Sequence, residues 1–140
     1  MNFLQGTITE IVTEGNISLV KVSVGEKIFS SIVLDTPATD PYLQTGHSVK
    51  LLFKETEVII SRSIPLEISV QNKMECRLRQ LTIGKILCQL TLGWQEDGTG
   101  KETEIHSIIT RNACEQLHLQ VNDKIIALIK TNEVSLAAYD

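Results

Sequence analysis

The 140-residue chain contains an internal repeat, in which two segments of similar sequence follow one another. A shift of 76 residues aligns the segment from about residue 28 to residue 61 with the segment from about residue 105 to residue 137, without a gap. The phrase FKETEV at residues 53–58 then corresponds to IKTNEV at residues 129–134. Such self-similarity indicates one small structural unit present twice. Each half alone would be marginally stable, so we expect close packing of the halves or oligomerisation. We therefore expect a first unit at residues 1–64 and a second unit at residues 65–140.

The beginning of each unit aligns with a shorter shift of 70 residues, which places Asn2 on Asn72 and Ile8 on Leu78. The phrase GWQEDGTG at residues 93–100 accounts for most of the difference, because it lengthens one connection in the second unit. Connections between strands tolerate insertions well. The repeat therefore extends over nearly all of both units.

Alternating and β-branched apolar segments predict strands throughout the chain. The expected strands lie at residues 7–12, 18–24, 28–34, 47–54 and 57–61 in the first unit, and at residues 75–82, 85–93, 102–110, 123–130 and 132–137 in the second. Hairpin turns are expected at residues 24–27 and at residues 55–56.

One short helix is predicted in the second unit, with Asn112 as its N-cap and Glu115 three residues further on. A short helix is also predicted in the corresponding segment of the first unit, residues 38–44, where Pro41 leaves a turn as the alternative. Residues 62–67 are expected to be an extended linker, because Pro65 biases its neighbour away from helix. Five short strands with one helical turn are typical of a small OB-like barrel. The predicted fold class is therefore all-β, with two tandem OB-like five-stranded barrels that each carry a short helix.

Composition excludes several classes of partner. The net charge is −4, no basic run is present and aromatic residues make up 4% of the chain, which disfavours nucleic acid binding. No apolar stretch approaches the roughly 18 residues of a membrane span, and the first ten residues lack the pattern of a signal peptide. Three cysteines without a C-x-x-C pair form a poor disulfide framework. We therefore expect a reduced cytoplasmic protein without a nucleic acid or membrane partner.

Neither an enzyme nor a metal site is predicted. No Ser/His/Asp arrangement is recognisable, and Gly98-Thr99-Gly100 has the character of a hairpin tip rather than a phosphate-binding loop. Cys114 and His118 lie four residues apart, but two ligands are too few for a metal, so we expect a buried thiol and an exposed imidazole. We predict no metal and no cofactor.

Several short motifs of the second unit resemble the molbindin or Mop family, whose units are TOBE-like. The motifs are SVQN at residues 69–72, GKILCQL at 84–90, IITRNA at 108–113 and the closing stretch LHLQVNDKIIALIKTNEVSLA at 117–137. Family units open with SARN and close with VIKA or VIKS, and the closing stretch is the most specific part of the resemblance. Because the resemblance covers both units, the chain looks like a free-standing protein of two Mop units.

This resemblance implies non-catalytic binding of molybdate or tungstate for storage, buffering or sensing. It also implies that the anion binds at interfaces between subunits of a homo-oligomer, of which a trimer is favoured and a dimer is possible. The bound anion is then a ligand rather than a cofactor. Carried over by position, the anion-contacting residues are Ser69, Gln71, Thr110, Ala113, Lys130 and Thr131 in the second unit and Lys54 in the first.

The chain departs from the family pattern at several of these positions. Gln71 replaces the arginine of SARN, and Ala113 replaces a hydroxyl residue. In the first unit, the residues at the threonine position, the hydroxyl position and the position after lysine are Leu34, Pro37 and Glu55, respectively. A carboxylate beside an oxyanion repels it. The alternative is therefore a degenerate regulatory or interaction module that keeps the fold and has lost the anion.

Molybdate is a tetrahedral dianion, so its site requires several converging N–H and O–H donors and a limited positive charge. Lys130 at a strand end and Thr110 before a helix meet this requirement. Each residue also has a simpler interpretation: Lys130 as a solvated surface lysine, and Thr110 as a helix cap. The repetition of a lysine at Lys54 and Lys130 favours the functional interpretation.

Overall fold

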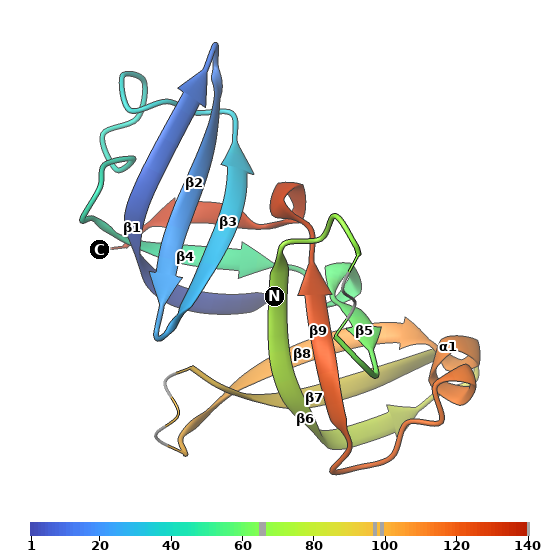
Figure 1. Cartoon of the computed structure of the whole chain (residues 1–140). Coiled ribbons are helices and arrows are strands. Elements are labelled where there is room, and N and C mark those ends of the chain that lie inside the picture. Colours follow the sequence, from blue (N-terminus) through green and yellow to red (C-terminus); the bar gives the residue numbers. More distant parts are fainter. Residues whose placement is uncertain (65–66, 97, 99, 140) are drawn as a thin grey trace.

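The computed structural model describes residues 1–64, 67–96, 98 and 100–139 (Figure 1). The strands of the first unit are β1 (Asn2–Glu14), β2 (Ile17–Val24), β3 (Lys27–Val33), β4 (Ser48–Phe53) and β5 (Ile59–Ser61). Those of the second unit are β6 (Asn72–Ile83), β7 (Leu87–Gln95), β8 (Glu102–Thr110), β9 (Lys124–Ile129) and β10 (Ser135–Ala138). The described chain also contains the helix α1 (Arg111–Gln116) and two 3-10 turns, η1 (Glu55–Glu57) and η2 (Thr131–Glu133). The all-β, OB-like fold class is thus confirmed.

The two units exchange their last strands. The sheets have the strand orders β10-β4-β1-β2-β3 and β5-β9-β6-β7-β8, so each contains four strands of one unit and the fifth strand of the other (Figure 1). In the antiparallel register, Ile60 of β5 lies opposite Ala127, and Leu136 of β10 lies opposite Leu51. The expectation of two separate five-stranded barrels is therefore wrong. The hairpin expected at residues 55–56 is also wrong, because η1 carries the chain from one sheet to the other.

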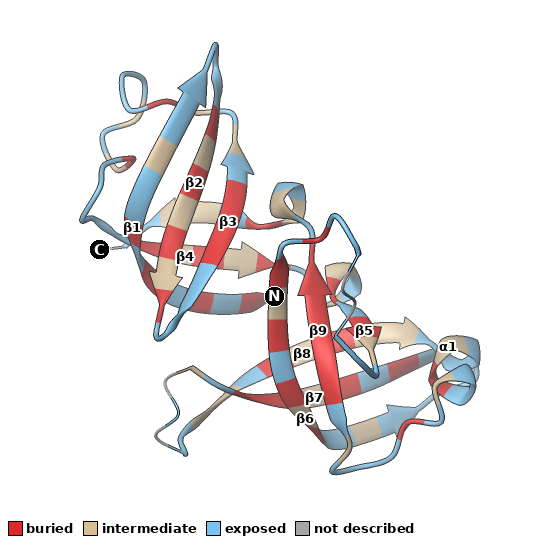
Figure 2. Cartoon of the chain, viewed as in Figure 1, coloured by how far each residue is buried: buried red, intermediate tan, exposed pale blue. Residues whose placement is uncertain are grey.

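The buried faces of the two sheets contribute to one continuous core. In β1 and β6 buried and exposed residues alternate, as the two-residue period of a half-buried strand requires (Figure 2). Phe29 of the first unit and Trp94 of the second pack in a T-shaped arrangement, with ring centroids 5.6 Å apart. The expected burial of Trp94 is confirmed, since its exposed fraction is 2%. The core therefore belongs to the whole chain rather than to either unit.

Two buried asparagines connect the units in equivalent ways. The side chain of Asn72 accepts a hydrogen bond from the Ser30 N–H at 2.8 Å and donates one to the Ser30 carbonyl at 2.9 Å. The side chain of Asn2 makes the same pair of bonds with the backbone of His106, both at 2.7 Å. Each amide thus satisfies a backbone N–H and C=O on the edge strand of the opposite sheet.

Two buried serines add a second pair of equivalent connections. The Ser31 hydroxyl donates to the Val134 carbonyl at 2.5 Å, and the Ser107 hydroxyl donates to the Val58 carbonyl at 3.0 Å. Both acceptors lie directly after the 3-10 turns that precede the exchanged strands. The internal repeat therefore appears in the structure as two matching sets of polar contacts between the units.

The helix and turns depart from the expectations in two respects. Helix α1 begins after Thr110, whose hydroxyl accepts the Ala113 N–H at 3.0 Å, so Thr110 rather than Asn112 is the N-cap. Thr110 takes this role because its backbone is still extended at the end of β8. Residues 38–44 form turns and no helix, so the short helix expected in the first unit is wrong, because Pro41 disfavours a helical conformation at the residue before it.

The hairpin expected at residues 24–27 is confirmed and contacts the opposite unit. Gly25 has φ +58°, and a Cβ at this position would lie 2.5 Å from the carbonyl oxygen of Glu96. The Glu26 N–H donates to the same oxygen at 3.0 Å. Glycine is therefore required here both by the backbone conformation and by the close approach of the two hairpins.

Some expectations fall outside the described part of the chain. The described residues do not include Pro65 and Leu66 of the expected linker, nor residues 97 and 99 of the long connection. Arg62, before the linker, pairs with Asp123 of the second unit at 2.9 Å. Among the helices of the described residues, none is both long and apolar enough to cross a membrane.

Candidate functional site

Four of the predicted anion-binding residues gather at one end of the second sheet. Asn72 at the start of β6 lies opposite Ile129 at the end of β9, so the preceding Gln71 and the following Lys130 are neighbours across the strand pair. Ser69 lies two residues before Gln71, and Thr131 begins η2 directly after Lys130. We call Ser69, Gln71, Lys130 and Thr131 the Lys130 cluster.

The Lys130 cluster is open to solvent. Thr131 is half-buried and the other three members are exposed. Lys130 has an extended backbone, and its ammonium makes no ion pair with any described residue. Because the side chain of Asn72 makes two hydrogen bonds with the backbone of Ser30, this end of the second sheet is held against β3 of the first. The cluster therefore offers one cation, two hydroxyls and one amide on a fixed backbone.

Lys54 lies in the corresponding position of the first sheet, with a different set of neighbours. Asn2 pairs with Phe53 across β1 and β4, which brings Met1 beside Lys54. The Met1 ammonium donates to the carboxylate of Glu55, and this hydrogen bond holds the pKa of Glu55 below its ordinary value. Glu55 is therefore ionised at neutral pH, and its charge is paired with that of the Met1 ammonium.

Thr110 and Ala113 lie at a third place. They are at the end of β8 and the start of α1, at the far end of the second sheet from η2 (Figure 1). The Thr110 oxygen already accepts the Ala113 N–H. Within one chain, the structure therefore does not bring Thr110 and Ala113 together with the Lys130 cluster.

Asn2 and Asn72 are important residues to which the sequence analysis gave no role. Their amides fix the end of each sheet at which Lys54 and Lys130 lie. The signal was present, because the two asparagines match in the repeat. What the sequence did not show is that each would bind the backbone of the opposite unit.

The cysteines and histidines occupy ordinary structural positions. Cys114 is buried and His118 is exposed, as expected from their spacing. The three thiols are free and buried, and burial raises the pKa of Cys76 to about 12. No group of three metal-ligating side chains is found within the described ranges of the chain.

Comparison with known proteins supports the resemblance seen in the sequence. Residues 68–136 match the TOBE domain. The second unit is a TOBE domain. The expected resemblance to the TOBE-like Mop units is thereby confirmed, and the TOBE domain contains all six predicted contact residues of the second unit.

The fold of the whole chain also matches a solved structure. The crystal structure of ModG, described as a cytoplasmic molybdate-binding protein and determined with molybdate bound, superposes with a TM-score of 0.88. The two sequences are 22% identical, and the match covers 99% of this TOBE-domain protein and 96% of ModG. The likeness shows that the two chains share their fold over nearly their full lengths. Comparison with curated protein sequences finds no match.

Proposed function

We propose that this TOBE-domain protein binds molybdate, without catalysis, at the Lys130 cluster. The observation that carries the proposal is the gathering of Ser69, Gln71, Lys130 and Thr131 at one end of the second sheet. The Mop resemblance assigns the same four residues by position in the sequence. The shared fold with ModG supports the same ligand.

The chemistry of the cluster suits a tetrahedral oxyanion. Lys130 supplies one positive charge, and Ser69 and Thr131 supply hydroxyl donors. Gln71 can donate two N–H groups at the position of the family arginine, but it adds no charge. We therefore expect molybdate to bind through one cation and several neutral hydrogen bonds, and tungstate, an anion of the same shape and charge, to bind as well.

An exposed cluster needs further donors and shelter from water to hold a dianion. Thr110 and Ala113 are the remaining predicted contacts, and they lie too far away to contribute within one chain (Figure 1). We therefore propose that they are supplied by another copy of the chain in a homo-oligomer, with a trimer favoured over a dimer. Storage, buffering or sensing of the anion in the cytoplasm, with neither nucleic acid nor membrane as partner, is the role that fits this arrangement.

The first unit is proposed not to bind the anion. Lys54 occupies the position of Lys130, but Glu55 stands where the second unit has the hydroxyl of Thr131, and its carboxylate supplies no donor to a dianion. Leu34 and Pro37 offer no side-chain donor at the remaining positions. The expected stoichiometry is therefore one anion per chain.

Titration calorimetry with molybdate, tungstate and sulfate tests the proposal. We expect the first two to bind and sulfate to be ignored, and we expect Lys130→Ala to abolish the binding, because it removes the only cation of the cluster. Lys85→Ala, at an exposed turn of the second unit, is the matched control and should bind like the wild type. Undiminished affinity of a folded Lys130→Ala protein would refute the site.

The second candidate function is an interaction module that no longer binds an anion. The absence of arginine at position 71 and the presence of Glu55 favour it. A folded oligomer that releases no heat with any of the three anions would support this alternative and would exclude molybdate binding.

A further inference from the structure

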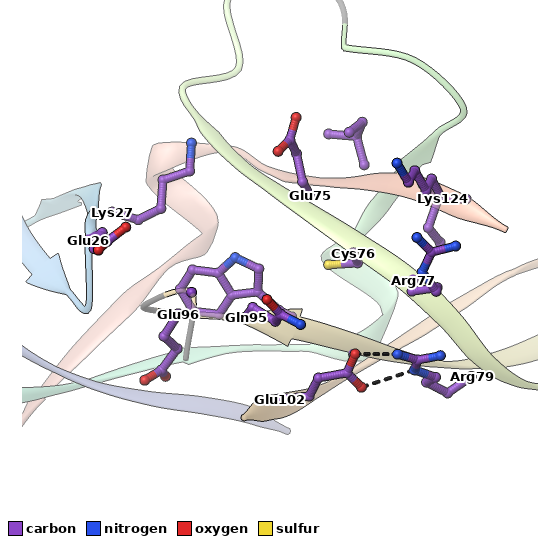
Figure 3. Close-up of a pocket in the computed structure, with 15 residues that line it drawn as sticks. Glu26, Lys27, Glu75, Cys76, Arg77, Arg79, Gln95, Glu96, Glu102 and Lys124 are labelled. Carbon is purple, nitrogen blue, oxygen red and sulfur yellow. Dashed lines mark hydrogen bonds and ion pairs between the residues drawn. The ribbon is translucent and has the colours of Figure 1, made fainter. Parts of the chain in front are cut away.

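The groove shown in Figure 3 carries charges of both signs. It lies over β6, β7 and the start of β9 and has a volume of about 640 Å³. Its described lining contains four carboxylates and four cations, among which Glu102 and Arg79 pair through two hydrogen bonds (Figure 3). This groove therefore offers no net charge to a ligand. A surface that differs clearly from its counterpart in the repeat lies instead on the first sheet.

The outer face of the first sheet carries a patch of apolar side chains that are open to solvent. Val12, Leu19 and Ile32 are partners across β1, β2 and β3, so they form one row. Their strand neighbours Val20 and Ser31 are buried, which places the row on the opposite, outer face, because side chains alternate along a strand. We call Val12, Ile17, Leu19, Ile32 and Leu34 the Leu34 patch.

The Leu34 patch is most exposed at the end of β3. The exposed fraction is 40% for Ile32, 45% for Ile17 and 76% for Leu34. Ser18 pairs with Val33, so Leu34, the next residue, lies beside Ile17 in the register. Contiguous apolar surface of this kind is a mark of an interaction site.

The second unit presents the corresponding surface with different chemistry. Gln89 stands at the position of Leu19, and Thr110, whose strand partner is Leu87, stands at the position of Leu34. Leu87 is itself 51% exposed, so apolar surface borders this place in both units. The second unit therefore carries a proposed anion contact where the first carries the most exposed leucine of its patch.

The Lys54 end of the first sheet shows a change in the same direction. Phe3 and Leu52 are partners across β1 and β4, and they share the outer face with Lys54. Phe3 is 52% exposed and stands at the position of Lys73 in the second unit. Both halves of the first-unit counterpart of the anion site are therefore apolar, although they lie at opposite ends of one sheet (Figure 1).

We propose that the Leu34 patch packs against Phe3 and Leu52 of a second copy of this chain, and that this contact holds the oligomer together without the anion. The inference rests on the proposed function, in which Thr110 of one copy meets the Lys130 cluster of another. Because the repeat relates the two pairs of surfaces, the same assembly brings the Leu34 patch to the Lys54 end of a neighbouring copy.

The chemistry of the two surfaces agrees with this contact. Apolar side chains on both sides exclude water from each other, and neither surface can reach the other within one chain. Contacts between two different surfaces of identical chains close into a ring, as in a trimer. The first units thus supply a permanent contact at the place where the second units close around the anion.

Sedimentation equilibrium of the full chain without molybdate tests the contact. We expect the wild type to be oligomeric. Leu19→Gln combined with Leu34→Thr installs the residues of the second unit, and we expect it to raise the dissociation constant at least about tenfold, because burial of two leucines is lost. Ile28→Thr is the matched control, since Ile28 is 52% exposed on the same strand and face but is separated from the patch by the buried Ser30. It should associate like the wild type.

A pair of opposite charges tests which surfaces meet. Leu34→Lys and Phe3→Glu should each dissociate the oligomer, because each would bury an unpaired charge in the contact. Both side chains are exposed in the single chain, so the fold should tolerate the changes, and circular dichroism checks this. The two changes in one chain should restore association, because the lysine of one copy then meets the glutamate of the next.

Calorimetry with molybdate on the same samples separates this contact from the proposed function. A wild type that is monomeric without molybdate, or undiminished association of the folded Leu19→Gln, Leu34→Thr protein, would overturn the contact even if the wild type binds the anion. A protein with both charge changes that stays dissociated would overturn the pairing of the two surfaces. An oligomer that the patch variants dissociate, but that gives no heat with molybdate, would support the contact and refute the anion site.

Discussion

At the scale of single residues, Asn2 and Asn72 show how the repeat is used. Both are buried, and each binds a backbone N–H and C=O of the opposite unit. An amide is suited to this task because it offers one acceptor and two donors in a plane, which match the exposed edge of a strand. The identity of these residues could be read from the repeat, but their partners, at residues 106 and 30, could not, because nothing local in the sequence encodes a contact between units.

We expect Asn72→Ala to lower the free energy of unfolding by about 2–4 kcal/mol, because the N–H and C=O of Ser30 would lose their buried partners. Urea denaturation measures the change, and Asn16→Ala, at an exposed turn, is the control. A loss no greater than that of the control would show that water or a neighbouring group replaces the amide.

At the scale of elements, the strands were predictable and their partners were not. The alternation of apolar residues located the strands to within a few residues, apart from β1 and β6, which begin at Asn2 and Asn72 rather than near residues 7 and 75. The pattern that identifies residues 57–61 as a strand is satisfied equally by pairing with β4 or with β9. Which of the two pairings forms depends on contacts between strands that are distant in the sequence, and in the structure β5 pairs with β9.

Deletion of residues 135–140 tests this exchange, because it removes β10 from the C-terminus of the second unit. We expect the first sheet to be affected, since β10 pairs with β4. Hydrogen exchange at the amides of β4 that face β10 should accelerate at least about tenfold relative to those of β9, which keeps both of its neighbours. Faster exchange confined to β9 would mean that β10 pairs within its own unit.

The candidate site divides in the same way between what the sequence predicts and what it does not. Motif positions identified Ser69, Gln71, Lys130 and Thr131, and the strand pairing of β6 and β9 brings these four together. The same motifs placed Thr110 and Ala113 with them, but these lie at the other end of the sheet (Figure 1). A motif records which residues take part in a site, and it does not record whether one chain or two must supply them.

At the scale of the whole molecule, the shared core and the exchanged strands predict one cooperative unfolding transition. Trp94 reports on the second unit, although its ring packs against Phe29 of the first. Thermal unfolding followed by Trp94 fluorescence and by far-ultraviolet circular dichroism should therefore give coincident curves. Two separated transitions would show that the units unfold independently despite the exchange.

The exchanged strands also bear on the history of such a chain. A single repeat would leave β4 without its outer neighbour and its own last strand without a partner, and only a second copy could supply both. One polypeptide with two repeats therefore forms the complete five-stranded sheets that a single repeat could form only as a dimer. Once the halves are joined in this manner, neither can be lost or replaced without the other, although the two remain free to diverge at the surface, as Glu55 and Thr131 have done at equivalent positions.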